Sequence, residues 1–361
     1  MLKKFQKIGM DQIQTYYQNK NRARHDLKYL FWECTLNCNF FCKHCGSNAG
    51  RGKSSLDLST SEIKKALSEI AEDFDVKKIM LAVTGGEPLL RKDVFEVMKY
   101  ASRLGFPWGM VTNGFLVTQK VVESMKDAGM RTVVVSVDGI GKSHDDFRNM
   151  GGAYEKAMNA VKLLAEANFL DNLQITTTIH TGNINFLEDM YEKFSSSGIH
   201  SWRLVSADPI GRAELNENLS LSGEQLRKLL LFIKEKRKMA KIGVFFGCTG
   251  FLGDEFEGSV RGNHFYCNTG INIASILHDG NIFVCPNVPR VKELMQGNVK
   301  ENRLSEIWEN DFKFFRDKNR TSCEECSSCK DWEKCLGNSL HVWDFQNKKP
   351  KICHYKLISE K

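Results

Sequence analysis

The sequence predicts an α/β protein built as a partial (β/α)6 barrel of the TIM type, followed by a small cysteine-rich C-terminal domain. Two observations support this. Apolar, β-rich runs alternate with helix-period segments over the first two-thirds of the chain, which is typical of right-handed βαβ units around a parallel sheet. Seven of the twelve cysteines then crowd into the last part. Six strand–helix units are two short of a closed eight-stranded barrel, so we expect an open one.

The expected strands are short runs rich in β-branched and aromatic residues, at 29–33, 78–83, 108–112, 132–137, 174–179 and 202–205. The helix-period segments between them lie at 60–72, 91–104, 117–128, 153–167 and 185–197. Ser59, followed three residues later by Glu62, is a capping-box signature for the first of these helices. A long helix over 222–238 and a glycine-rich stretch at 246–253 come next.

These elements divide the chain into four segments: a basic leader at 1–28, the barrel at 29–220, a helix and glycine-rich bridge at 221–262, and the cysteine-rich domain at 263–361. The last segment has little continuous apolar periodicity. Small domains of that kind are usually stabilised by metal.

Composition narrows the class of protein. The chain has 361 residues, of which 42% are hydrophobic and 26% charged, which is ordinary for a globular protein and excludes dominant disorder. No apolar run reaches the length of a membrane span, so we expect no transmembrane segment. No basic stripe with interleaved aromatic residues is present, so we expect no nucleic-acid partner.

The leader holds seven Lys/Arg against two Asp, and therefore most of the net charge of +7. We expect a solvated segment; the alternative is an arm that contacts an acidic peptide or a membrane surface. The N-terminus shows no apolar core of a secretory signal, which predicts a cytoplasmic protein with reduced thiols. Clustered cysteines in that setting indicate metal binding rather than disulfides.

Three cysteines follow the first expected strand in a C-x3-C-x2-C pattern: Cys38, Cys42 and Cys45. This position is the carboxyl end of a parallel strand, where α/β active sites form. Three thiolates do not complete a structural zinc site, but they suit a [4Fe–4S] cluster that keeps one iron open. Cys34, at the strand end, is expected to be a small buried residue.

The spacing resembles the signature of the radical S-adenosylmethionine (radical SAM) superfamily. In that family the open iron binds the amino and carboxylate groups of SAM, and reductive cleavage gives methionine and a 5′-deoxyadenosyl radical. Further residues on successive strand ends resemble other motifs of the family. The resemblance assigns these to the cofactor site: Gly85, Gly86, Glu87 and Pro88 after the second strand, Thr112 and Asn113 after the third, Ser136 and Asp138 after the fourth, Arg148 in a His-Asp…Arg-Gly segment, and Thr178 on the fifth.

The resemblance also implies individual roles. The paired glycines let the backbone approach a ligand, and Glu87 pairs with an ammonium group. Arg148 binds the SAM carboxylate with Ser136 beside it, since a guanidinium suits that forked contact. Thr178 contacts the ribose. His44 stands where the family usually has an aromatic residue near adenine; an imidazole still stacks there, and we expect no proton transfer from it.

The second cysteine group resembles the SPASM (twitch-type) domain, which carries auxiliary iron–sulfur clusters. Its expected ligands are Cys267, Cys285, Cys323, Cys326, Cys329, Cys335 and Cys353. The family pattern gives the complete site to Cys326, Cys329, Cys335 and Cys353. Cys267 and Cys285 belong to a second site, whose further expected ligand is replaced by Ser339, with Cys323 as a substitute. One or two auxiliary [4Fe–4S] clusters are therefore expected; zinc knuckles are the alternative.

By this resemblance the chain is a radical SAM enzyme that abstracts a hydrogen atom from a peptide or small protein, as in the crosslinking or epimerisation of ribosomal peptides. Its partners would be a precursor peptide or a lipoprotein and an electron donor such as flavodoxin or ferredoxin. Pro286 stands where sulfatase-maturing relatives carry a catalytic Asp, so formylglycine formation is not expected. The alternatives are an enzyme acting on a small molecule, such as a dehydrogenase or a haem-pathway enzyme, and a non-enzymatic iron–sulfur or zinc module.

Cys248 stands apart from both cysteine groups, within the glycine-rich stretch. In epimerising relatives a free cysteine returns a hydrogen atom to the substrate radical, which makes Cys248 a candidate hydrogen donor. The other explanation is a thiol that only packs in its loop.

Overall fold

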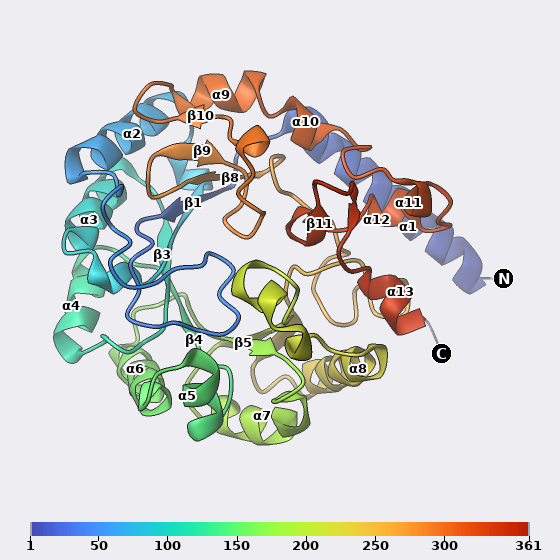
Figure 1. Ribbon diagram of the computed structural model, residues 1–361, viewed down its shortest axis with the longest axis horizontal. Helices are drawn as coiled ribbons and strands as arrows, with labels where there is room; N and C mark the ends of the chain where they lie inside the picture. Colours follow the sequence, from blue (N-terminus) through green and yellow to red (C-terminus); the bar gives the residue numbers. More distant parts are fainter. Residues whose placement is uncertain (1, 360–361) are drawn as a thin grey trace.

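The computed structural model describes the backbone of residues 2–359 and the side chains of residues 13–216 and 218–359. Its centre is a ten-stranded sheet with the order β10-β9-β8-β1-β2-β3-β4-β5-β6-β7. The sheet curves around a central space and helices cover its outer face, so that the open barrel predicted from the sequence is confirmed (Figure 1).

The six expected strands are present, and each end lies within two residues of its predicted position. They run parallel to their neighbours, so their carboxyl ends meet at one edge of the barrel. They are β1 (Tyr29–Glu33), β2 (Met80–Thr84), β3 (Trp108–Thr112), β4 (Thr132–Ser136), β5 (Asn172–Ile179) and β6 (Ser201–Ser206).

The expected outer helices are also present: α2 (Thr60–Asp73), α3 (Val94–Leu104), α4 (Gln119–Asp127), α6 (Ala153–Ala167), α7 (Leu187–Ser195) and α8 (Gly223–Met239). The capping box of α2 is confirmed, because the Glu62 backbone N–H donates to Ser59 Oγ and the Ser59 N–H donates to Glu62 Oε2. A further helix, α5 (Lys142–Arg148), was not expected; it carries the His-Asp…Arg segment.

The sheet extends beyond the predicted barrel at both edges. β7 (Gly243–Phe246) comes from the segment expected to be only a helix and glycine-rich bridge, and it pairs in parallel with β6. β8 (Ile273–Ile276) comes from the cysteine-rich region and pairs in parallel with β1. β9 (Asn281–Phe283) and β10 (Gly297–Asn298) add antiparallel strands beyond it. The cysteine-rich region is therefore continuous with the barrel sheet.

The remaining C-terminal elements are short. They are α9 (Leu304–Asn310), α10 (Lys313–Arg316), α11 (Glu324–Ser327), α12 (Trp332–Cys335), α13 (His354–Ser359), β11 (Trp343–Asp344) and β12 (Lys349–Pro350). Single 3-10 turns lie at η1 (Val76–Lys78), η2 (Pro88–Leu90), η3 (Ile184–Phe186), η4 (Gly211–Leu215), η5 (Glu217–Leu219), η6 (Lys292–Leu294) and η7 (Leu340–Val342).

The basic leader contains a helix, α1 (Leu2–Arg24), which runs along the C-terminal region beside α12 (Figure 1). Gln18 is buried, and the backbone carbonyl of His25 accepts a hydrogen bond from Trp308 Nε1 at 2.9 Å. The end of the leader therefore packs on the protein instead of being wholly solvated. The side chains of Lys3, Lys4 and Lys7 lie outside the described residues.

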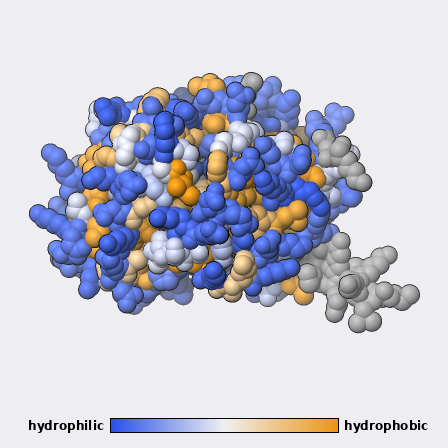
Figure 2. Space-filling view, turned by 90° about the horizontal axis from the view of Figure 1, so that it is seen from below, coloured by the Kyte–Doolittle hydropathy of each residue, from blue (hydrophilic) through white to orange (hydrophobic). Residues whose placement is uncertain are grey.

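The core lies between the sheet and its helices, where the side chains of Trp32, Trp108 and Trp202 are fully buried. The face in Figure 2 is mostly hydrophilic, with hydrophobic residues scattered over it. Within residues 2–359, no helix combines the length and the apolar character needed to cross a membrane.

Candidate cofactor site at the mouth of the barrel

The cysteine loop follows β1 at the carboxyl edge of the sheet. Cys38 and Cys42 are buried and Cys45 is half-buried. The loop is closed at its base, since the Cys38 N–H donates to the Gly50 carbonyl and the Gly50 N–H donates to the Leu36 carbonyl, both at 3.1 Å. Three thiols on one short loop are thus held near one another at the barrel mouth, as the sequence predicts.

Burial raises the pKa of Cys38 to about 12 and that of Cys42 to about 11, and the three thiols also act on one another. The guanidinium groups of Arg148 and Arg212 lower the pKa of Cys42 and so oppose this effect. Iron binds the thiolate form, which cationic neighbours favour. The donor set and its charged surroundings fit an iron–sulfur cluster held by Cys38, Cys42 and Cys45.

The paired glycines after β2 approach the cysteine loop and not an open space. A Cβ on Gly85 would lie 2.2 Å from the Thr35 carbonyl oxygen, and one on Gly86 would lie 2.2 Å from that of Asn37. Gly85 also has a φ of +141°, which other residues rarely adopt. These glycines let the β2 end pack against the loop that carries Cys38, and their expected approach to a ligand stays a prediction.

Glu87 is fully buried, and its carboxylate is hydrogen-bonded within the protein. It accepts hydrogen bonds from Thr112 Oγ1 at 2.8 Å, from the Asn113 N–H at 2.7 Å and from the Leu89 N–H at 3.2 Å. Burial raises its pKa, while these donors act in the opposite direction. Glu87 thus ties β2, with Pro88 opening η2 behind it, to the end of β3. Its expected pairing with an ammonium group stays a prediction.

We therefore expect Glu87→Ala to act first on stability. Three donors, two of them buried, would lose their acceptor. Each buried loss costs about 1–3 kcal/mol, so the free energy of unfolding should fall by roughly 3 kcal/mol or more. Urea denaturation measures this change, with Glu96→Ala, an exposed carboxylate, as the control. A variant of normal stability that fails to bind SAM would instead support a direct contact between Glu87 and the cofactor.

Thr112 and Asn113 continue this connection to the cysteine loop. Asn113 Nδ2 donates to Asn39 Oδ1 at 2.8 Å, and Asn113 Oδ1 accepts from the Phe115 N–H at 2.9 Å. Thr112 Oγ1 accepts from the Gly114 N–H. Both residues therefore lie at the expected place, where they hold the loop between Cys38 and Cys42.

Asp138 and Arg148 form a buried ion pair behind the cysteine loop, with 2.8 Å between Arg148 Nε and Asp138 Oδ2. Burial acts to raise the pKa of Asp138, but Arg148 and the nearby His44 and His144 lower it to about 2. Among the described residues, the terminal nitrogens of Arg148 have no hydrogen-bond partner. The arginine is therefore charged, held by Asp138, and retains donors for an anion, in keeping with the expected contact to a carboxylate.

His44 is stacked on Phe147 with ring centroids 4.3 Å apart, and Phe147 is stacked on His180 at 4.0 Å. Burial lowers the pKa of both histidines to about 4, so both are neutral at pH 7. One face of His44 is thus already covered by a phenyl ring, which sequence reasoning did not foresee. Only the other face or the ring edge remains for an adenine.

Ser136 and Thr178 lie at the neighbouring ends of β4 and β5, and both are half-buried. The Thr178 N–H donates to Asp138 Oδ1 at 2.7 Å. Asn183, which the sequence analysis did not single out, donates through Nδ2 to the carbonyls of Asp138 and Thr178, at 2.9 Å each. Thr178 is therefore brought together with Asp138, the partner of Arg148, and Ser136 ends the neighbouring strand β4.

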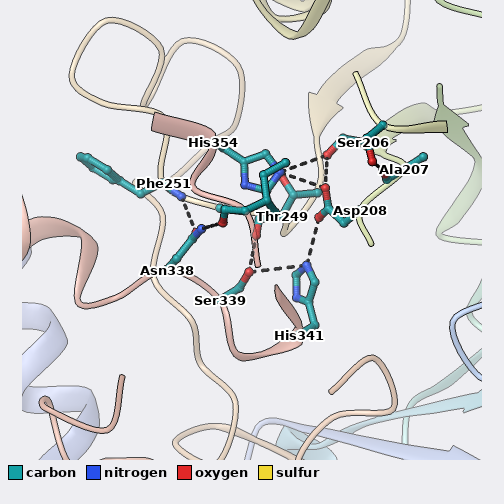
Figure 3. A network of polar contacts seen from close by, with 12 residues as sticks. Ser206, Ala207, Asp208, Thr249, Phe251, Asn338, Ser339, His341 and His354 are labelled. Atoms are coloured by element: carbon teal, nitrogen blue, oxygen red, sulfur yellow. Dashed lines mark hydrogen bonds and ion pairs between the residues drawn. The ribbon is translucent and has the colours of Figure 1, made fainter. Parts of the chain in front are cut away.

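A second polar cluster at the barrel mouth was missed. Asp208, two residues beyond β6, lies between His354 at 2.9 Å and His341 at 3.3 Å, and it also accepts from Ser206 Oγ (Figure 3). Burial would raise the pKa of Asp208, but the two histidines depress it far below its usual range. The sequence signal that could have revealed this cluster is an Asp directly after a parallel strand. The histidine partners could not be foreseen, because they come from the distant C-terminal segment.

Five C-terminal cysteines gather in one place: Cys323, Cys326, Cys329, Cys335 and Cys353. Cys326 is hydrogen-bonded to Cys323 and lies within electrostatic reach of Cys335 and Cys353, which in turn face Cys329. The expected complete set is thus brought together. Cys323 lies with this set and not with Cys267 and Cys285, because Cys323 stands at the start of α11, the helix that also carries Cys326.

Cys267 and Cys285 lie near each other, and Cys248 lies beside both. This position was not expected for Cys248. In the described part of the chain, no group of three or more Cys, His, Asp or Glu side chains is arranged to hold a single metal ion.

Two family models and several known proteins match this chain. The Radical SAM superfamily model matches residues 32–194, and the model of an iron–sulfur cluster-binding domain, SPASM, matches residues 267–330. The AdoMet-dependent heme synthase of Methanosarcina barkeri is 29% identical over 91% of this chain and 97% of its own length. The mycofactocin maturase MftC of Mycolicibacterium smegmatis is 25% identical over 86% of this chain and 77% of its own.

Among solved structures, anSMEcpe with bound AdoMet has the same fold, with a TM-score of 0.71, 18% sequence identity, and coverage of 92% of this chain and 94% of that one. The cysteine loop and the strand-end residues around it lie in the region that the first model matches, and Cys267, Cys285, Cys323, Cys326 and Cys329 lie in the region that the second matches. A SAM-binding [4Fe–4S] cluster and auxiliary clusters are therefore this protein's cofactors, and the chain is a radical SAM enzyme with a C-terminal SPASM domain.

Proposed function

We propose that this enzyme modifies a peptide or small protein by abstracting a hydrogen atom from it. Bound SAM, on one-electron reduction, supplies the adenosyl radical that carries out such an abstraction. Cys38, Cys42 and Cys45 would hold the cluster, and Arg148, fixed by Asp138, would hold the carboxylate of SAM. An electron donor such as flavodoxin or ferredoxin would provide the electron.

The observation that carries the proposal is a cavity of about 270 Å³ that lies between the cysteine loop and the auxiliary region. Asn48 and Ile210 line one side, and Pro289, Arg290 and Lys351 line the other. Arg290 pairs with buried Glu33, and Lys351 pairs with Glu214 at 2.6 Å, so both cations are already neutralised. A largely uncharged opening between the two cluster regions suits a peptide segment better than a polyanion.

The likeness to the maturase MftC, which spans most of the chain, also supports a peptide substrate. A small-molecule substrate is the second candidate, because the heme synthase is slightly more similar and matches over nearly its whole length. Formylglycine formation is not proposed, since Pro286 follows Cys285 where the sulfatase-maturing relatives carry an acidic residue.

Substrate-dependent SAM cleavage decides between these candidates. The reconstituted enzyme would be incubated anaerobically with SAM and dithionite, together with either candidate small proteins or iron porphyrins. We expect 5′-deoxyadenosine formation to rise well above the substrate-free rate only with one of the small proteins, which should also show a mass change. A response to the porphyrins alone would instead establish the small-molecule function.

A further inference from the structure

Arg212 lies against the cysteine loop, although it belongs to η4, which follows β6. Its side chain is buried, and its Nε donates to the Cys42 carbonyl at 2.7 Å. Its Nη1 donates to the Ala49 carbonyl at 2.8 Å and to Asn48 Oδ1 at 3.1 Å. The Arg212 backbone N–H donates to the Cys45 carbonyl at 3.1 Å. A single arginine therefore joins the part of the loop that holds the last two cysteines of the pattern to the part where the chain turns back.

The positive charge of Arg212 is not balanced by the polypeptide around it. Its hydrogen-bond acceptors are carbonyl and amide oxygens, and in the described part of the chain no carboxylate forms an ion pair with it. Arg148, by contrast, is paired with Asp138. The guanidinium also lies over the ring of Phe41, with 4.0 Å between Arg212 Cζ and the ring centroid. Because a buried cation without an anionic partner is costly, this site calls for an anion.

The loop that Arg212 contacts is the one whose thiols fit an iron–sulfur cluster. Such a cluster with three thiolate ligands carries net negative charge, and one-electron reduction adds one more negative charge. A fixed cation nearby therefore stabilises the reduced form more than the oxidised form. For two unit charges about 10 Å apart at an effective dielectric constant of about 20, this changes the equilibrium constant roughly tenfold.

The segment that carries Arg212 is itself fixed on both sides. Asn216 Nδ2 donates to the Lys43 carbonyl of the cysteine loop at 3.1 Å and to the Arg212 carbonyl at 2.9 Å. Four residues before Arg212, Asp208 is held by His341 and His354 of the C-terminal region (Figure 3). The guanidinium is thus preorganised, and its charge acts from a fixed position without further rearrangement.

We propose that Arg212 is a positioning residue for the SAM cluster: it holds the cysteine loop in place, and its unbalanced charge makes the cluster easier to reduce. The two arginines near the loop then have separate tasks, with Arg148 directed at SAM and Arg212 at the cluster. The proposal rests on the assignment of this cluster to Cys38, Cys42 and Cys45, and it is independent of the substrate.

Arg212→Gln and Arg212→Lys separate the charge of the side chain from its forked shape. The reconstituted enzymes would be titrated anaerobically with a reductant and followed by EPR, reading the component that is absent from the Cys38→Ala, Cys42→Ala, Cys45→Ala variant. In Arg212→Gln the equilibrium should shift roughly tenfold towards the oxidised cluster, which lowers a one-electron potential by about 59 mV. Arg212→Lys keeps the charge, so its potential should stay close to that of the wild type.

Arg237→Gln is the matched control. Arg237 also donates to a backbone carbonyl, that of Val244 at 3.0 Å, but it lies on the outer helix α8, so the potential should not change. An unchanged potential in Arg212→Gln would overturn the proposal, and so would an equal decrease in Arg212→Lys.

Iron content decides the case in which Arg212→Gln assembles no SAM cluster and holds about eight irons per chain instead of about twelve. Full iron in Arg212→Lys would then support a need for the charge, whereas the same loss in both variants would show a structural role alone and overturn the proposal. An EPR spectrum that is unchanged in the triple cysteine variant would refute a different statement, the assignment of the cluster to this loop.

Discussion

Replacing Cys38, Cys42 and Cys45 together by alanine should abolish SAM cleavage and leave the auxiliary iron in place. The three thiols are the only cysteines of this loop, and Cys248, Cys267 and the C-terminal group are held by other segments. Anaerobic reconstitution, iron analysis and chromatography of 5′-deoxyadenosine measure both effects. The iron content should fall from about twelve to about eight per chain, one cubane's worth.

Cys34→Ala is the matched control, because this thiol belongs to the same stretch but is fully buried at the end of β1, where burial holds its pKa well above the usual range. Its removal leaves a small cavity and costs some stability, but iron binding and SAM cleavage should remain. Persistent 5′-deoxyadenosine formation in the triple variant would refute the assignment of the cluster to this loop.

Arg148→Ala should weaken SAM binding roughly tenfold to a hundredfold, because a charged hydrogen bond contributes about 1.5–3 kcal/mol. Calorimetric titration of the reconstituted enzyme with SAM measures this change. The variant should also be less stable by about 3–5 kcal/mol, since Asp138 would remain buried without its partner. Unchanged SAM affinity would contradict the role given to Arg148.

Lys236→Ala separates the two effects. Lys236 is buried and paired with Glu188 at 2.7 Å, yet it lies on the outer helix α8. Its loss should lower stability without changing SAM affinity.

Acid titration of the wild type gives a second readout of the ion pair between Arg148 and Asp138. Because the pKa of Asp138 is depressed to about 2, the stability it contributes is complete above pH 4 and is lost as the pH falls towards 2.

Much of the fold was accessible from local sequence signals. The six barrel strands are apolar runs between turn residues, and the Ser59–Glu62 pair marked the start of a helix that the structure confirms. β7 and β8 were missed because each has only four residues, too short for a periodicity. Their assignment depends on β6 and β1 as pairing partners, which no local pattern encodes. The helix of the leader was missed for a similar reason, since its packing partners lie in the C-terminal region.

In the candidate site, too, features that are local in the sequence were predictable and contacts between distant segments were not. Cysteine spacing identified the metal-binding loops, because the ligands of one loop are close in sequence. The partners of Glu87 and of Asp208 were not predictable, since they come from other strand ends or from the far C-terminal segment. The grouping of Cys248 with Cys267 and Cys285 likewise depends on how far the sheet curves. No residue pattern near Cys248 predicts how strongly the sheet curves.

The pairing of β8 with β1 has a consequence for how the chain is made. β1 is synthesised shortly before β2, which can cover one of its edges early, but the other edge waits for Ile273–Ile276, which follow much later in the chain. A nascent chain therefore carries an unpaired, apolar strand edge until β8 has been made, and such edges promote aggregation. Chains truncated before β8 should accumulate in inclusion bodies, whereas those that include β10 should remain dispersed.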